Sequence, residues 1–223
     1  MDELLQYAPG LLVGFGNNLK LSVVVGIFSL IVGTILAAMR VSPIPVLRAT
    51  GTTYVNILRN TPLTLVLAFC SLGLSDTLGL IFSQEDPSTN AFWLAVLGMS
   101  AYTSTFVCEV LRSGVNTVPM GQAEAARAIG LTFTQSASLI IFPQAFRTVI
   151  APLGSVFIAM IKNTTVVAAA GYTLEVANVM RTDFDTIGVS IPIFLGIVVA
   201  FVVIILPLGY FTGWLSRRLA VAR

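Results

Sequence analysis

Long uncharged apolar runs constrain the fold of this chain more than any other feature of its sequence. A helix needs about 20 apolar residues to cross the hydrocarbon core of a bilayer. Runs of about that length cover roughly residues 21–39, 62–74 with an extension toward 82, 91–107, 149–161 with an extension to 171, and 189–214. An alternative start of the first run at residue 11 places Asn17, Asn18 and Lys20 near its outer end. We therefore expect an all-α integral membrane protein with five transmembrane helices.

Composition supports this class and excludes several functions. The mean hydropathy is +0.93, and only 10% of the residues are charged, against about 25% in soluble proteins. Five spans use most of the 223 residues, so we expect a single transmembrane domain over 1–223 with no room for an ATPase. No Gly-x-x-x-x-Gly-Lys-[Ser/Thr] sequence occurs, so nucleotide must be handled by a partner.

The sequence shows no recognisable catalytic group and no metal-binding pattern. The chain contains no histidine, which removes Ser-His and Cys-His nucleophilic catalysis and the commonest metal ligand. Cys70 and Cys108 lie inside apolar runs without metal-binding spacing, and we interpret them as buried small hydrophobic residues. We expect no catalytic residue, no metal site and no cofactor bound by this chain itself.

The charges predict the orientation of the spans. Basic residues gather in alternate connections, which contain Arg40, Arg48, Arg59, Arg112, Arg127, Arg147, Arg217, Arg218 and Arg223. The other connections, 1–10, 83–90 and 172–188, are acidic and contain Arg181 as their one basic residue. By the positive-inside rule the amino terminus is outside and the carboxyl terminus inside. No basic leader precedes the first span, so we expect no removable signal peptide.

A small-residue polar insert from 121 to 143 separates the third and fourth spans. Helix-forming residues follow Pro119 and Gly121, and Gly130 stands where a left-handed residue commonly ends a helix. Thr132 and Gln135 have the spacing of a capping box, which would start a second helix. The insert is predicted to form a thin helix, a sharp turn and a helix that returns to the membrane.

This insert resembles the Glu-Ala-Ala loop of bacterial ABC importer permeases. The match rests on Glu124, Ala125, Ala126 and Gly130, followed by Ile140 and Pro143, with Phe142 in place of the usual leucine. The resemblance implies a short cytoplasmic coupling helix between spans three and four, within a loop of about 112–146. The residues expected to dock onto an ATPase are Gly121, Gln122, Glu124, Ala125, Ala126 and Gly130. The alternative is an ordinary cytoplasmic loop with incidental alanines.

Two further segments resemble the polar amino acid branch of these permeases. Residues 59–63 read Arg-Asn-Thr-Pro-Leu and open the second span, although a helix start with an arginine at the lipid border would explain them equally. Residues 162–165 read Lys-Asn-Thr-Thr and interrupt the fourth span about 20 Å from its cytoplasmic end. Transporters often break a helix beside the substrate.

We expect the second segment to line the substrate path, with Lys162 attracting a carboxylate and Asn163, Thr164 and Thr165 beside it. The alternative is a lysine that reaches the outer headgroups while the threonines bond back to their own helix.

The resemblance covers nearly the whole chain, and it is strongest to glutamate-type permeases. It implies a bacterial cytoplasmic membrane protein that imports a polar amino acid by alternating access. Its implied partners are a second permease subunit, identical or homologous, two ATP-binding subunits that hold ATP and Mg²⁺, an external solute-binding protein and membrane lipid, without nucleic acid. The alternative is an ion-coupled secondary carrier, although acidic residues at mid-membrane and inverted repeats are not evident.

Two patterns concern helix packing. Small residues recur along one face of the first span, at Ser22, Gly26, Ser29, Gly33 and Ala37, which predicts a close helix contact. Gly209 and Gly213 suggest the same more weakly for the last span.

Glu109 precedes Arg112 by three residues, which favours a local ion pair over a role in an inner gate.

Overall fold

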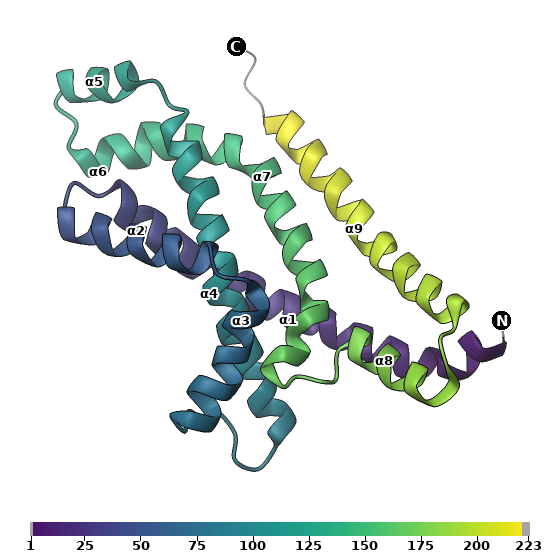
Figure 1. The fold of residues 1–223 in the computed structure, drawn as a ribbon. Helices are drawn as coiled ribbons and strands as arrows, with labels where there is room; N and C mark the ends of the chain where they lie inside the picture. The colour runs from purple at the N-terminus through teal and green to yellow at the C-terminus, as the bar shows by residue number, and fades with distance from the viewer. Residues whose placement is uncertain (1, 220–223) are drawn as a thin grey trace.

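The fold consists of helices joined by short connections, in a computed structural model that describes residues 2–219 (Figure 1). The first half contains α1 (Asp2–Val41), α2 (Pro45–Arg59), α3 (Leu63–Ala68), the π-helix η1 (Phe69–Thr77) and α4 (Pro87–Asn116). The second half contains α5 (Met120–Ala128), α6 (Phe133–Ser136), the π-helix η2 (Ala137–Ile141), α7 (Phe142–Asn163), the 3₁₀-helix η3 (Thr164–Ala170), α8 (Val176–Ile187) and α9 (Ile191–Leu219). Residues 2–219 contain no strand, so the all-α prediction is confirmed for this part of the chain.

Four stretches of the described chain are long and apolar enough to cross a membrane. They are Gln6–Val41, Pro87–Asn116, Thr134–Ala170 and Ile191–Leu219. A fifth crossing is reached if α2 and the α3–η1 segment count as one span, although the two parts meet at an angle of 103°. The predicted runs 21–39 and 91–107 thus lie inside longer helical stretches, and the runs 149–171 and 189–214 extend beyond theirs by at most two residues. The predicted run from 62 is short and sharply bent from the helix before it.

The helix α2 was missed by the sequence analysis, which treated residues 40–59 only as a connection. Pro45 occupies the first turn, where its missing N–H costs nothing, and the helix buries Gly51 and Val55. A Cβ atom at Gly51 would lie 3.0 Å from Cγ of Arg40, so glycine lets α2 pack closely on α1. Pro62 then caps α3 with extended backbone (φ −56°, ψ 135°), and the chain turns between the two helices.

The predicted small-residue face of α1 packs against α4. Ser22, Ser29 and Ala37 are buried, and a Cβ atom at Gly33 would lie 2.6 Å from Cβ of Val107. Gly26 instead faces α7, with the Cε of Met160 at 3.7 Å from its built Cβ. The prediction of a close contact along this face is confirmed, because small side chains let helices approach where lipid gives no hydrophobic drive to associate.

Glycines also set the contacts of α7. A Cβ atom at Gly114 of α4 would lie 2.2 Å from Val149, and one at Gly154 would lie 2.6 Å from Thr212 of α9. The predicted Gly209 does face α7, with Ile158 at 3.5 Å, whereas Gly213 meets only Arg217 of its own helix. The helices α4, α7 and α9 therefore pack in sequence, with α7 in the middle (Figure 1).

The two ends of the bundle carry different kinds of connection, a short helix at one end and an irregular segment at the other. The short helix α5 lies at one end, and the connection from η1 to α4 lies at the opposite end (Figure 1). There Asp86 caps α4 by accepting hydrogen bonds from Thr89 Oγ1 at 2.6 Å and from Ser88 N at 2.9 Å. These bonds stabilise the carboxylate and lower the pKa of Asp86 to about 2.

Candidate functional site

The helix α5 presents most of the residues that the sequence singled out. Gly121, Gln122, Glu124 and Ala125 are exposed, whereas Ala126 is buried against the rest of the loop. Two large apolar side chains flank this surface, since Met120 is 74% exposed and Ile129 is 76% exposed. An exposed face that combines apolar ends with a small-residue centre is typical of a surface that another protein covers.

Gly130 ends α5 as predicted. Its φ is +87°, which L side chains rarely adopt. Gly130 N donates to Arg127 O at 3.0 Å, and Leu131 N donates to Ala126 O at 3.1 Å, which together form a Schellman motif. The glycine therefore fixes the direction in which the chain leaves α5.

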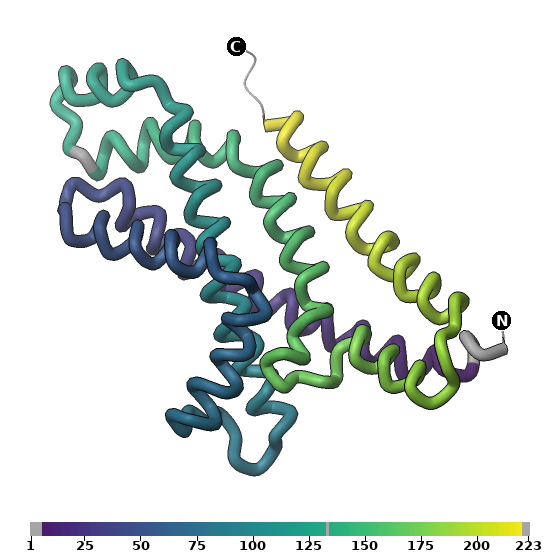
Figure 2. Tube along the Cα trace, viewed as in Figure 1, coloured from purple at the N-terminus to yellow at the C-terminus, as the bar shows by residue number. Residues whose placement is uncertain are grey.

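The predicted capping box is also present. Thr132 N donates to Gln135 Oε1 at 2.9 Å, and Gln135 N donates to Thr132 Oγ1 at 3.3 Å. Figure 2 shows the chain reversing direction between α5 and α6, and α6 then continues through η2 into α7. The predicted order of helix, sharp turn and helix is confirmed.

The helix α5 lies close in the chain to the end of α4, and that end of α4 packs against α7. Only residues 117–119 separate it from the end of α4. At that end the close contact of Gly114 with Val149 holds α4 against α7, and the hydroxyl oxygens of Thr117 and Thr148 lie 3.4 Å apart. A displacement of α5 would therefore reach α4 and α7 together.

The Lys162–Thr165 segment lies where α7 changes into the 3₁₀-helix η3. Lys162 and Asn163 are the last residues of α7, and Thr164 and Thr165 begin η3. Thr164 Oγ1 donates to Ile161 O at 2.7 Å, and Thr165 Oγ1 donates to Lys162 O at 2.8 Å. The predicted interruption is thus a change of helix type, and both threonines bond back to their own helix, as the alternative reading anticipated.

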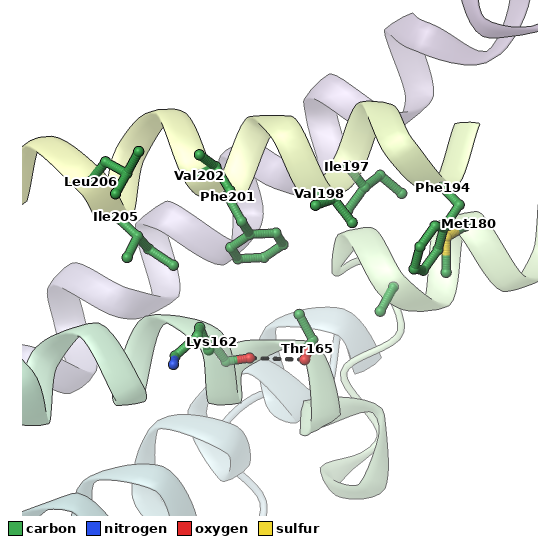
Figure 3. A pocket seen from close by; sticks show the side chains of 11 residues that line it. Lys162, Thr165, Met180, Phe194, Ile197, Val198, Phe201, Val202, Ile205 and Leu206 are labelled. Atoms are coloured by element: carbon green, nitrogen blue, oxygen red, sulfur yellow. Dashed lines mark hydrogen bonds between the residues drawn. The ribbon is translucent and has the colours of Figure 1, made fainter. Parts of the chain in front are cut away.

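Lys162 and Thr165 border an apolar pocket of about 470 Å³ between α7, α8 and α9 (Figure 3). The remaining lining is a row of α9 side chains together with Ala177 and Met180 of α8, and the α9 row comprises Phe194, Ile197, Val198, Phe201, Val202, Ile205 and Leu206. Within residues 2–219 the ammonium group of Lys162 makes no ion pair. The segment therefore carries a positive charge beside an otherwise apolar wall.

Thr164 is placed differently from its neighbours, because it is fully buried. Its hydroxyl oxygen accepts a hydrogen bond from Asn18 Nδ2 at 2.9 Å. Asn18 Oδ1 in turn accepts from Val176 N at 2.8 Å. From the sequence, Asn18 is expected only near the outer end of the first span, and its partners could not be inferred because they lie 146 and 158 residues away.

Glu175 lies next to this network and is 1% exposed. Its carboxylate caps α8 by accepting hydrogen bonds from Asn178 N at 2.6 Å and from Ala177 N at 2.7 Å. Burial raises the pKa of Glu175, while these hydrogen bonds act in the opposite direction.

A cluster of charges lies on the other side of the bundle, around Glu109 of α4. Arg112 Nη1 lies 3.7 Å from Glu109 Oε2, which confirms the predicted local pair. Arg40 of α1 approaches more closely, at 2.5 Å from Oε1, and Arg59 of α2 lies 3.7 Å from the same oxygen. Three helices therefore converge on one carboxylate, which pairs with Arg59 as well as with Arg40 and Arg112.

A groove of about 320 Å³ lies beside this cluster, between the end of α2, α4 and α7. Arg59 and Glu109 line one side, and Thr148, Val149 and Pro152 line the other. Arg40, which pairs with Glu109, has a side chain that is only 8% exposed. Its part in the cluster was missed by the sequence analysis, since position 40 showed only a basic residue at a span end.

Comparison with known proteins identifies the family. The family described as "binding-protein-dependent transport system inner membrane component" matches residues 29–221. The chain belongs to this permease family. Permeases of this family are transport components of ABC systems, so the chain is a multi-pass protein of the bacterial cytoplasmic membrane.

Relatives within the family narrow the class. The glutamate transport system permease protein GluC of Corynebacterium glutamicum is 47% identical over 220 residues, covering 96% of each chain. The probable glutamine ABC transporter permease protein GlnM of Bacillus subtilis is 32% identical and covers 92% of this chain and 91% of that protein. The chain is thus a polar amino acid ABC permease, most similar to the glutamate type.

Solved structures share the fold. The crystal structure of an amino acid ABC transporter with histidines superimposes with a TM-score of 0.85. The two chains are 25% identical, and the match covers 97% of each. The inward-facing MetNI methionine ABC transporter gives a TM-score of 0.77 at 19% identity, covering 99% of this chain and 100% of that chain. These likenesses support the ABC permease fold.

Proposed function

We propose that this chain is the permease subunit of an ATP-driven importer for glutamate. The observation that carries the choice of glutamate is the 47% identity to a glutamate transport permease over nearly the full length of both chains. The single domain 1–223 would carry substrate across the membrane without catalysing a reaction, while separate ATP-binding subunits hold ATP and Mg²⁺. We place the amino terminus outside and the carboxyl terminus inside, since arginine is concentrated on one side of the predicted spans.

The helix α5 is the proposed coupling element, within the loop of about 112–146. Its exposed residues Gly121, Gln122, Glu124 and Ala125 would meet a groove on the ATPase, while Ala126 and Gly130 hold the helix in position. Closure of the ATPases would push α5 and, through the short connection to α4, favour the outward-facing state. A shift from 1:99 to 99:1 requires about 5.5 kcal/mol of difference in contact energy between the states.

The Lys162–Thr165 segment is the proposed substrate contact. Lys162 and Thr165 border a pocket and are accessible there, and the ammonium group is free to attract a carboxylate. Asn163 lies beside them at the end of α7. Thr164, which is buried, would act by fixing the shape of the segment.

The complete importer would contain a second permease subunit, two ATP-binding subunits and an external solute-binding protein. The family description itself refers to binding-protein-dependent transport. A secondary carrier would be driven by an ion gradient and would need neither ATP nor a binding protein.

ATP-dependent uptake by the reconstituted complex tests the coupling role of α5. We expect Glu124→Trp to abolish ATP-dependent uptake while the subunit still inserts and assembles, because position 124 is exposed and the larger side chain would block docking. Glu85→Trp, an exposed change at the opposite end of the molecule, is the matched control and should transport normally. Unchanged coupled uptake by Glu124→Trp would contradict the docking role.

A second experiment tests Lys162. Uptake by Lys162→Ala and Lys162→Arg is compared at saturating binding protein for glutamate, aspartate and glutamine. We expect Lys162→Ala to lose most uptake and Lys162→Arg to keep part of it, because arginine retains the positive charge. Wild-type rates in Lys162→Ala would remove this residue from the substrate path.

A further inference from the structure

The side chain of Asn18 in α1 lies buried against η3 and α8. It is 1% exposed, and both ends of its amide are engaged. The nitrogen donates to Thr164 Oγ1 at 2.9 Å, and the oxygen accepts from Val176 N at 2.8 Å. One side chain thus bonds both the start of η3 and the start of α8.

The surrounding contacts make this position hard to change. A Cβ atom at Gly14, one turn before Asn18, would lie 3.0 Å from Cα of Val176, so α1 runs directly against the first residue of α8. Ser22 Oγ donates to Asn18 O at 2.7 Å. Glu175 holds the next two N–H groups of α8. The amide of Asn18 therefore occupies a closely packed site with fixed partners on two sides.

Asparagine suits this site because it donates and accepts at once. Leucine has nearly the same shape but would leave Val176 N without its partner and Thr164 Oγ1 without its donor. Aspartate would keep the acceptor for Val176 N, lose the donor for Thr164, and place a second carboxylate near Glu175. The chemical identity of the residue therefore matters more than its volume.

We propose that Asn18 is a positioning residue of the substrate path. The path itself is the Lys162–Thr165 segment, so this inference rests on the proposed function. The hydrogen bond to Thr164 fixes where α7 ends and η3 begins. That boundary sets the direction in which Lys162 and Thr165 face the pocket, although Asn18 touches neither of them.

Thiol labelling tests this geometry independently of transport. Thr165→Cys is introduced in a chain whose native cysteines are replaced by alanine, and a small charged thiol reagent is added to the assembled complex in liposomes. We expect Asn18→Leu to change the labelling rate at position 165 at least fivefold. Asn17→Leu is the matched control, because Asn17 bonds Leu174 O from a more exposed position, and it should change the rate less than twofold.

The rate of uptake is the second measurement that tests the proposal. Rates are normalised to assembled complex for Asn18→Leu, Thr164→Val and the double variant. We expect each single variant to lose about tenfold and the double variant to be no worse than either, because both remove the same hydrogen bond. Multiplying effects, an unchanged labelling rate, or wild-type normalised uptake in Asn18→Leu would each overturn the proposal.

Two outcomes separate this proposal from the function on which it rests. If glutamate does not slow labelling of Thr165→Cys in the otherwise unchanged chain, the proposed substrate path fails, and Asn18 loses its role in transport with it. If glutamate protects and Asn18→Leu has no effect, only the positioning role fails. Should Asn18→Leu not assemble, Asn18→Asp is used in its place, and failure of both to assemble would show a folding role only and overturn the proposal.

Discussion

The Glu109 cluster and the Asn18 network join distant parts of the chain by different physical means. Around Glu109, three arginines share one carboxylate that is 27% exposed, and Arg59 and Arg112 are 50% and 40% exposed. Around Asn18, an uncharged amide, a hydroxyl and a backbone N–H are all buried. Partly exposed ion pairs exchange partners easily, whereas a buried amide network holds one arrangement.

This difference suggests that the two regions tolerate rearrangement to different degrees. The Glu109 cluster lies beside a groove and contains three arginines for one carboxylate, so its ion pairs can exchange while Glu109 stays paired. The Asn18 network can only remain intact or break. The comparison therefore predicts that the two regions respond differently to mutation, pH and salt.

Glu109→Ala should have the largest effect on stability. Arg40, whose side chain is 8% exposed, would lose its carboxylate. Removing one partner of a buried pair costs about 3–5 kcal/mol, and because Glu109 is partly exposed we expect the lower value, about 3 kcal/mol. Denaturant unfolding of the purified complex measures the loss. Glu124→Ala on exposed α5 is the control, and a loss no larger than in that control would contradict a structural role for the cluster.

Asn18→Leu should cause the second largest loss of stability. It leaves Val176 N buried without a partner, and an unsatisfied buried group costs about 1–3 kcal/mol. The same unfolding measurement, with Asn17→Leu beside it, gives the difference between the buried and the more exposed asparagine. Equal losses in the two variants would show that burial of the network contributes nothing.

Glu175 should make the stability of the region around α8 sensitive to pH. Burial raises its pKa above the ordinary 4.5, so the folded state holds this proton more tightly than the unfolded state. Its contribution to stability is then greatest below pH 4.5 and is lost as the pH rises through the raised folded pKa. Glu175→Gln should remove this slope and cost about 1 kcal/mol through the weaker cap. Unfolding measured across this pH window checks it, and identical profiles would refute it.

Salt should have the smallest effect and should act on the Glu109 cluster alone. Raising the salt concentration from 0.1 to 1 M shortens the screening length from about 10 to about 3 Å. We expect a loss below about 1 kcal/mol in the wild type, and none in Glu109→Gln. The Asn18→Leu variant should respond to salt as the wild type does. A salt effect that survives Glu109→Gln would locate the sensitive charges elsewhere.

Local sequence signals predicted local structure well. The glycine at 130 and the pair Thr132 and Gln135 define a helix end and a helix start by contacts within a few residues, and both formed as expected. The small-residue face of α1 also predicted a close helix contact, because its spacing follows the helix repeat. These features need no knowledge of the rest of the fold.

Contacts between distant residues could not be predicted in the same way. Arg40 and Glu109 are 69 residues apart, and the sequence shows only the nearer partner, Arg112. Asn18 looked like an ordinary polar residue near a span end. The helix α2 was missed because its arginines indicated a connection between spans and its threonines and glycine favour helix weakly. The roles of Lys162 to Thr165 and of α5 stay predictions until transport is measured.

The tight seam at Gly33 limits where motion can occur during transport. Because the position has no space for even a methyl group between α1 and Val107, the two helices cannot rotate against each other without collision. Gly114 and Gly154 lock α7 to its neighbours in the same manner. The helices α1, α4, α7 and α9 would therefore move together as one nearly rigid body.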